Sequence, residues 1–151
     1  MNLTLQEKIK NDLIQALKDR NEIKKSTLRT LQSSIKNKEI EFGRKLSDQE
    51  IGQIVTKEIK QRKDSIVEFE KGSRDELAQK EKEEIAVLEI YQPAQLSDQD
   101  IEKLVKQTIS QLSATSPQDI GKVMSKLMPI ISGKADGSKV SMMVKKHLNQ
   151  P

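Results

Sequence analysis

The chain has 151 residues, of which 34% are hydrophobic and 33% charged, and it contains no cysteine. The missing cysteine excludes disulfides, thiolate metal sites and a cysteine nucleophile. No apolar run approaches the roughly 20 residues of a membrane-spanning helix, and the first residues lack the apolar core of a signal peptide, so we expect a cytoplasmic protein without a membrane partner.

The first 92 residues predict four helices, because their apolar residues recur three or four positions apart. We expect these helices at about residues 4–19, 22–41, 47–71 and 73–91. Ser47 with Glu50, and Ser73 with Glu76, form the capping-box pattern that begins a helix, and Gly72 is placed to end the third helix. Since the chain has only three aromatic residues, the core must consist of Leu, Ile, Val and Met.

The stretch around Pro93 separates this part from a second helical part. Pro93 has no backbone N–H and must end a helix, and Ser97 with Asp100 resembles the start of the next one. Further helices are expected at about residues 98–112, from Ser116 to Pro129, and around residues 140–148. The fold class is therefore all-α, with an N-terminal four-helix bundle-like domain (residues 1–92) and a small C-terminal three-helix module (residues 93–151).

The formal net charge is +4, and a basic segment lies in the N-terminal part. Residues 20–45 contain eight basic and three acidic side chains. Lys25, Arg29 and Lys36 fall within about 40° of one another beside the apolar stripe of the second helix. They form either a solvated helix face or a ridge that contacts phosphates.

A second basic surface is expected in the C-terminal module. Lys122 and Lys126 are one helical turn apart, and further lysines follow at positions 134, 139, 145 and 146, namely Lys134, Lys139, Lys145 and Lys146. In the loop between them, Asp136 is placed to cap the last helix; alternatively, Gly133 and its neighbours hold a phosphate through backbone amides. Gly121, inside a helical pattern, predicts a close approach of two helices.

Signals for catalysis are weak. Glu58 and Arg62 lie four residues apart within an apolar stripe, which favours a pair that bridges packed helices, although such a pair could also belong to a site. His147 is the only histidine; without a second ligand it is a poor metal-ligand candidate, and we expect it to interact with a helix dipole. We therefore expect no catalytic residues, no metal site and no cofactor.

Six stretches, in their order and spacing, resemble the GatB/YqeY family: residues 26–29, 35–40, 61–65, 91–96, 119–124 and 133–137. The resemblance implies a small bacterial helical protein, similar to the tail of the B subunit of the tRNA-dependent amidotransferase. It further implies a link to tRNA and to carbon–nitrogen ligases that use glutamine as amido donor. Because the catalytic body of that enzyme is missing here, catalysis by this chain alone is not expected.

The resemblance makes the C-terminal module the tRNA-facing part, through Gly121, Lys122, Gly133, Lys134, Ala135, Asp136 and Gly137. We predict a non-catalytic tRNA-binding module whose RNA-binding residues are Lys122, Lys126, Lys134, Lys139, Lys145, Lys146, Gly133, Asp136, Lys25, Arg29 and Lys36. The alternative is a protein-interaction adaptor that docks on an aminoacyl-tRNA synthetase or amidotransferase complex. A third hypothesis is an auxiliary subunit in amide transfer. The sequence indicates no oligomeric state.

Overall fold

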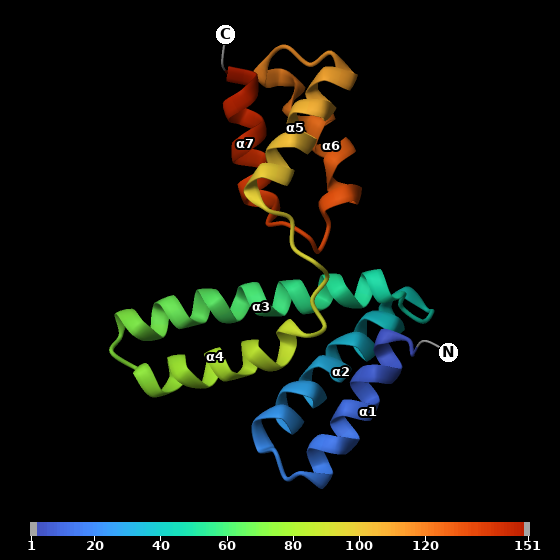
Figure 1. The fold of residues 1–151 in the computed structure, drawn as a ribbon, viewed down its shortest axis with the longest axis vertical. Helices are drawn as coiled ribbons and strands as arrows, with labels where there is room; N and C mark the ends of the chain where they lie inside the picture. Colours follow the sequence, from blue (N-terminus) through green and yellow to red (C-terminus); the bar gives the residue numbers. More distant parts are fainter. Residues whose placement is uncertain (1–2, 150–151) are drawn as a thin grey trace. The chain divides into compact units, whose positions relative to one another are not determined.

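The computed structural model describes residues 3–149, and over that range the chain is all-α, which confirms the predicted fold class (Figure 1). The described elements are α1 (Leu5–Lys18), α2 (Glu22–Phe42), α3 (Asp48–Lys71), α4 (Asp75–Glu89), α5 (Asp98–Leu112), the short 3₁₀ helix η1 (Pro117–Asp119), α6 (Ile120–Ile131) and α7 (Gly137–Asn149). None of these helices is long and apolar enough to cross a membrane.

The chain divides into two compact units, which we call the N-terminal unit (residues 1–93) and the C-terminal unit (residues 94–151). The N-terminal unit contains α1 to α4, and the C-terminal unit contains α5 to α7. Each has its own cluster of buried apolar side chains. Each unit therefore has the core that an independent fold requires.

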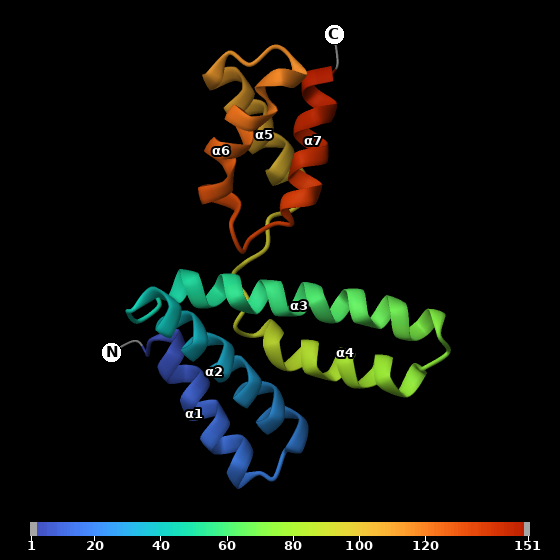
Figure 2. The same ribbon diagram turned by 180° about the vertical axis from the view of Figure 1, so that it is seen from behind.

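The N-terminal unit consists of two antiparallel helical hairpins, α1–α2 and α3–α4, which cross one another (Figures 1 and 2). The bundle-like arrangement predicted for this part is therefore not confirmed. The two hairpins share one core, built mainly of Ile9, Leu28, Leu31, Ile35, Ile51, Val55, Ile59 and Leu88.

Two helix starts follow the capping signals in the sequence. Before α3, the Ser47 hydroxyl accepts a hydrogen bond from the Glu50 amide at 3.2 Å, and the Glu50 carboxylate accepts one from the Ser47 amide at 3.0 Å. Hydrogen bonds from Arg44 lower the pKa of Glu50 to about 2, so this carboxylate stays charged at neutral pH. Before α5, the Ser97 hydroxyl accepts from the Asp100 amide at 3.1 Å. Both predicted starts are confirmed.

The predicted capping box at Ser73 is wrong. Ser73 has a φ of 56°, in the left-handed region, and its amide donates to the Glu70 carbonyl. The Arg74 amide donates to the Phe69 carbonyl, so these two amides close the end of α3. Helix α4 then begins at Asp75 with no side-chain cap. An N-cap residue typically has an extended backbone, which Ser73 does not adopt, so it does not cap α4.

Replacing Ser73 with glycine is expected to stabilise the N-terminal unit by about 0.5–1 kcal/mol, because glycine adopts a positive φ without steric cost. Urea denaturation of Ser73→Gly measures the gain. Ser65→Gly is the matched control, since Ser65 lies inside α3 and its replacement should cost about 0.5–1 kcal/mol. A loss of stability in Ser73→Gly would contradict the proposed left-handed turn.

The segment that follows α4 within the N-terminal unit contacts α1 and α3. The buried Tyr91 hydroxyl donates to the Asp12 carboxylate on α1 at 2.5 Å. Pro93 packs on α3 at Gly52, where an added Cβ would lie 3.0 Å from the Pro93 Cγ atom. A Cβ at Gly121, by contrast, would meet nothing within 4 Å. The close approach predicted at Gly121 is therefore wrong, and Gly52 provides one instead.

A largely buried polar cluster joins α2, α3 and α4. The Arg62 guanidinium lies between the α4 carboxylates, with Nε 3.0 Å from Glu84 Oε2 and 3.8 Å from Glu81 Oε2. Glu58, which is only 8% exposed, accepts a hydrogen bond from Ser34 on α2 at 2.7 Å and lies 3.8 Å from Arg62. The interpretation of Glu58 and Arg62 as a pair that bridges packed helices is confirmed.

The C-terminal unit packs α5, α6 and α7 around Ile101, Val105, Val123, Leu127, Ile131, Val140, Val144 and Leu148. Helix α6 continues through Pro129 to Ile131, two residues beyond the predicted end. The segment that leads into α5 is held against the α6–α7 loop, because the Leu96 amide donates to the Lys134 carbonyl and the Gln95 side chain donates to the Gly133 carbonyl, both at 2.9 Å.

Candidate nucleic-acid interface

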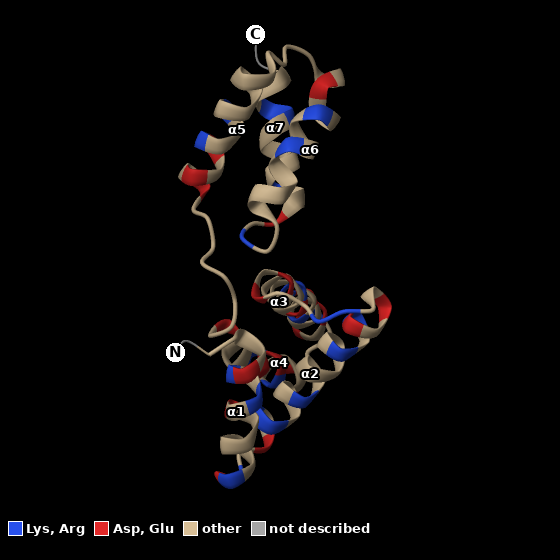
Figure 3. Ribbon diagram, turned by 90° about the vertical axis from the view of Figure 1, so that its right-hand side faces the viewer, with Lys and Arg blue, Asp and Glu red and all other residues tan. Residues whose placement is uncertain are grey.

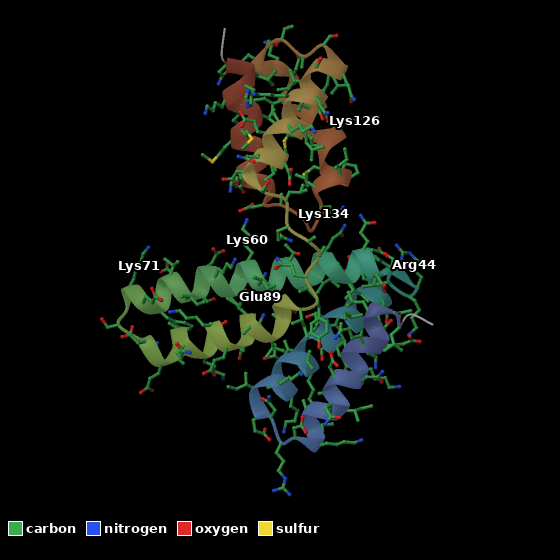
Figure 4. All side chains as sticks on the ribbon, in the orientation of Figure 1. Arg44, Lys60, Lys71, Glu89, Lys126 and Lys134 are labelled. Carbon is green, nitrogen blue, oxygen red and sulfur yellow. The ribbon has the colours of Figure 1, made fainter. Side chains whose placement is uncertain are left out.

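Helix α6 carries basic and apolar side chains on opposite flanks. Val123 and Leu127 are fully buried, so they mark the face of α6 that packs on the core. Lys122 and Lys126 each precede one of them by a position, which turns both lysines about 100° to one side of that face. Met124 and Met128 each follow by one position and lie on the other side. The two lysines therefore share one exposed flank of α6, on which Figure 4 labels Lys126.

The methionine flank of α6 borders a groove shared with α7. This groove has a volume of about 510 Å³, and Met124, Met128 and Met142 line it together with Lys145. Met128 is 44% exposed and Met142 is 71% exposed. Met128 therefore lies on an exposed flank of α6, although its helical spacing from Met124 and Leu127 would suit a buried position. The run of methionines was the signal that could have indicated an exposed apolar groove.

Lys139 and Lys146 lie on a third surface, next to α5. They line a groove with Glu102, Met143 and His147. Lys139 pairs with Asp98, and the His147 Nε2 atom lies 3.5 Å from the Glu102 carboxylate. This surface therefore carries both signs of charge. The structure brings four of the predicted lysines together in two pairs, Lys122 with Lys126 and Lys139 with Lys146, whereas Lys145 borders the methionine-lined groove and Lys134 lies in the α6–α7 loop.

The α6–α7 loop has a structural task. Gly133 has a φ of 78°, a conformation that glycine adopts without cost. The Asp136 carboxylate accepts a hydrogen bond from the Ser138 amide at 3.0 Å, at the start of α7. Asp136 therefore caps this helix, as the first of the two interpretations of the loop predicted. Lys134 follows Gly133, and its side chain is exposed (Figure 4).

Most lysines of the C-terminal unit are free to bind an anion. Among the described residues, no ion pair involves Lys122, Lys126, Lys134, Lys145 or Lys146. At the start of α6, backbone hydrogen bonds from Thr115 and Ser116 hold the pKa of Asp119 below its usual value, so Lys122 has one fixed negative charge nearby. Lys126 and Lys134 are exposed and have no such neighbour in the described ion pairs.

The basic residues predicted on α2 differ in their surroundings. Lys25 pairs with Glu22 at 2.8 Å, whereas Arg29 is exposed. Lys36 lines a groove between α1 and α2 together with Lys10 and Lys45. Figure 3 shows basic residues recurring along α2, but they do not form one uninterrupted ridge of free charges.

The comparisons with known proteins identify a family and several yeast relatives. The family described as "Yqey-like protein" matches residues 6–148. The chain is 44% identical over 87 residues to "Altered inheritance of mitochondria protein 41, mitochondrial" of Kluyveromyces lactis, an alignment that covers 57% of this chain and 47% of that protein. The protein of the same name from Vanderwaltozyma polyspora is 40% identical over 84 residues, covering 55% of this chain and 45% of the relative.

These relatives correct two expectations. Both carry the word mitochondrial in their names, which contradicts the predicted cytoplasmic location. Both are yeast proteins, and a bacterial origin of this chain is not supported.

The matches also show how much of the chain aligns with the relatives and with the family. The aligned part spans about half the length of these curated relatives, and neither name states a molecular activity. The family match, by contrast, extends over nearly all of the chain and includes both helical units. The chain belongs to the Yqey-like protein family.

Proposed function

We propose that this protein is a non-catalytic RNA-associated module that binds tRNA through its C-terminal unit. The observation that carries the proposal is the set of five exposed lysines on α6, α7 and the loop between them that form no ion pair among the described residues, namely Lys122, Lys126, Lys134, Lys145 and Lys146. Lysine ammonium groups bind phosphates as point charges and release counterions, so the binding should depend strongly on salt. With three aromatic residues in the whole chain, base stacking contributes little.

The resemblance of the C-terminal unit to the amidotransferase B-subunit tail supports tRNA as the RNA. A folded RNA is recognised by its phosphates, its 2′-hydroxyl groups and its shape, which suits a rigid helical surface with separated lysines. In this proposal, a link to carbon–nitrogen ligase chemistry runs through a partner enzyme. A tRNA-dependent amidotransferase assay with and without the protein tests for participation in amide transfer.

Neutralising Lys122, Lys126 and Lys134 together is expected to weaken tRNA binding and to lower the salt slope by about 2–3, because each lost phosphate contact reduces that slope by roughly one. Fluorescence titration of bulk tRNA at several salt concentrations measures both quantities. The matched control replaces Lys57, Lys63 and Lys80 of the N-terminal unit with glutamine, which gives the same net charge. Equal binding by the two triple variants would contradict the proposed interface.

The second candidate is an adaptor that docks on an aminoacyl-tRNA synthetase or amidotransferase complex. The methionine-lined groove between α6 and α7 favours it, since exposed methionines are frequent on protein-binding surfaces. Cross-linking from position 142, followed by identification of the captured protein, tests this candidate. Capture of a synthetase or amidotransferase subunit that is lost on Met128→Glu would favour the adaptor.

A further inference from the structure

A groove in the N-terminal unit, unrelated to the lysines of α6 and α7, has the features of a ligand site. It lies between α1 and α2 and has a volume of about 520 Å³. Small-molecule sites commonly have volumes of about 300–1,000 Å³. The base of the groove is well packed, because Ile9 and Ile35 there are 0% and 2% exposed and belong to the core of the unit. The groove is therefore formed before any ligand arrives.

The acidic groups of the groove are already engaged by backbone amides. The Glu7 carboxylate accepts a hydrogen bond from the Thr4 amide at 2.9 Å, as part of the capping box of α1. The Glu39 carboxylate accepts one from the Leu46 amide at 3.1 Å. Each carboxylate is thereby held toward the backbone at one end of a helix.

The basic groups of the groove are not engaged in the same way. Within residues 3–149, neither Lys10 on α1 nor Lys36 on α2 forms an ion pair, and both side chains are exposed. Lys45 approaches the Glu39 carboxylate only at 3.8 Å. Three ammonium groups therefore border one groove from α1, α2 and the loop after α2. An anion placed among them would reduce their mutual repulsion.

Neutral hydrogen-bonding groups complete the lining. Gln6 on α1 and Gln32 on α2 are half-buried and face the groove. Side-chain amides provide both donors and acceptors, so they suit the polar body of a small ligand beside its charged group. The two glutamates near the lysines disfavour a long polyanion, since they would repel its further phosphates. A small ligand with one concentrated anionic group fits better.

We propose that the α1–α2 groove binds the phosphate group of a small phosphorylated molecule through Lys10 and Lys36, with Lys45 at the rim. This assignment gives Lys36 a small ligand in place of the RNA phosphates expected from the sequence. It is independent of the RNA proposal, because the groove lies entirely within the N-terminal unit.

The test is an NMR titration of the full chain with inorganic pyrophosphate at fixed ionic strength. Saturable shifts are expected at the amides of Lys10, Gln32 and Lys36. The double variant Lys10→Gln/Lys36→Gln should bind about tenfold more weakly or worse, because charge-assisted hydrogen bonds are lost. The matched control, Lys18→Gln/Lys63→Gln, changes the net charge equally at exposed positions outside the groove and should bind like the parent chain.

Several outcomes would overturn the proposal. Shifts spread over all lysine-rich surfaces would mean non-specific attraction, and equal affinity in the double variant would exclude Lys10 and Lys36. Citrate at matched ionic strength provides the chemical control, and binding as tight as that of pyrophosphate would exclude selectivity for phosphate. Unfolding curves of both variants confirm that they fold, since the replaced side chains are exposed.

Discussion

Replacing Arg62 with leucine is expected to lower the free energy of unfolding of the N-terminal unit by about 3 kcal/mol, the low end of the range for removing one partner from a buried ionic cluster, because Arg62, Glu81 and Glu84 keep some exposure. Arg62 is the guanidinium between Glu81 and Glu84 of α4, and it also lies 3.8 Å from Glu58. Without it, three carboxylates would share a poorly solvated space. Chemical denaturation of the variant at neutral pH measures the loss.

The stability lost on replacing Arg62 with leucine should be smaller at acidic pH than at neutral pH. Burial and the neighbouring Glu84 already raise the pKa of Glu81 above its usual 4.5, and removing Arg62 raises it further. A folded state that binds protons more tightly than the unfolded state gains stability as the pH falls through the raised pKa toward 4.5. Lys63→Leu, at the exposed neighbouring position, serves as control and should change stability by no more than about 0.5 kcal/mol. A loss below about 1 kcal/mol in Arg62→Leu would contradict the bridging role.

Replacing Tyr91 with phenylalanine is expected to lower the stability of the N-terminal unit by about 1.5–3 kcal/mol, the range for a hydrogen bond to a charged group. The ring stays in the core, so only the hydroxyl that donates to Asp12 is lost. Burial together with the Asp12 hydrogen bond raises the pKa of Tyr91, so the hydroxyl keeps its proton at neutral pH. Urea denaturation of Tyr91→Phe measures the change.

The effect of Tyr91→Phe has its own pH dependence. Burial raises the pKa of Asp12, but the hydrogen bonds from Tyr91 and Lys8 outweigh burial, and the pKa lies below its usual 3.8. A depressed carboxyl pKa gives stability that is present above 3.8 and is lost as the pH falls through the folded-state value. The difference between the parent chain and the variant should therefore narrow in strong acid. If Asp12→Asn had the same stability as the parent chain at neutral pH, the claim that the charge of Asp12 strengthens the hydrogen bond from Tyr91 would be contradicted.

Local signals in the sequence predicted much of the fold, and contacts between distant residues explain what they missed. Ser47 and Ser97 begin their helices as expected, because a cap depends only on residues three positions apart. Helical spacing also predicted that Glu58 and Arg62 lie on the same face of α3. It could not show that Arg62 reaches Glu84 on α4, 22 residues away, since that contact depends on how the hairpin packs.

The lysines of the C-terminal unit illustrate the same distinction. Their number and order were visible in the sequence, but the flank on which each lies follows from which neighbours are buried. Lys126 precedes the buried Leu127, while Lys145 follows the buried Val144, so the two lie on different flanks of their helices. A count of basic residues therefore predicted a charged unit, and only the packing of α6 and α7 separated its surfaces.

The RNA proposal is tested most directly by titrating bulk tRNA against the full chain and against residues 94–151 at several salt concentrations. The fragment has its own apolar core and is expected to fold. If the C-terminal unit carries the site, both proteins should bind with similar affinity and a similar salt slope. Absence of binding by the fragment at low salt, with binding by the full chain, would place the site elsewhere, and absence of binding by both would contradict the proposed function.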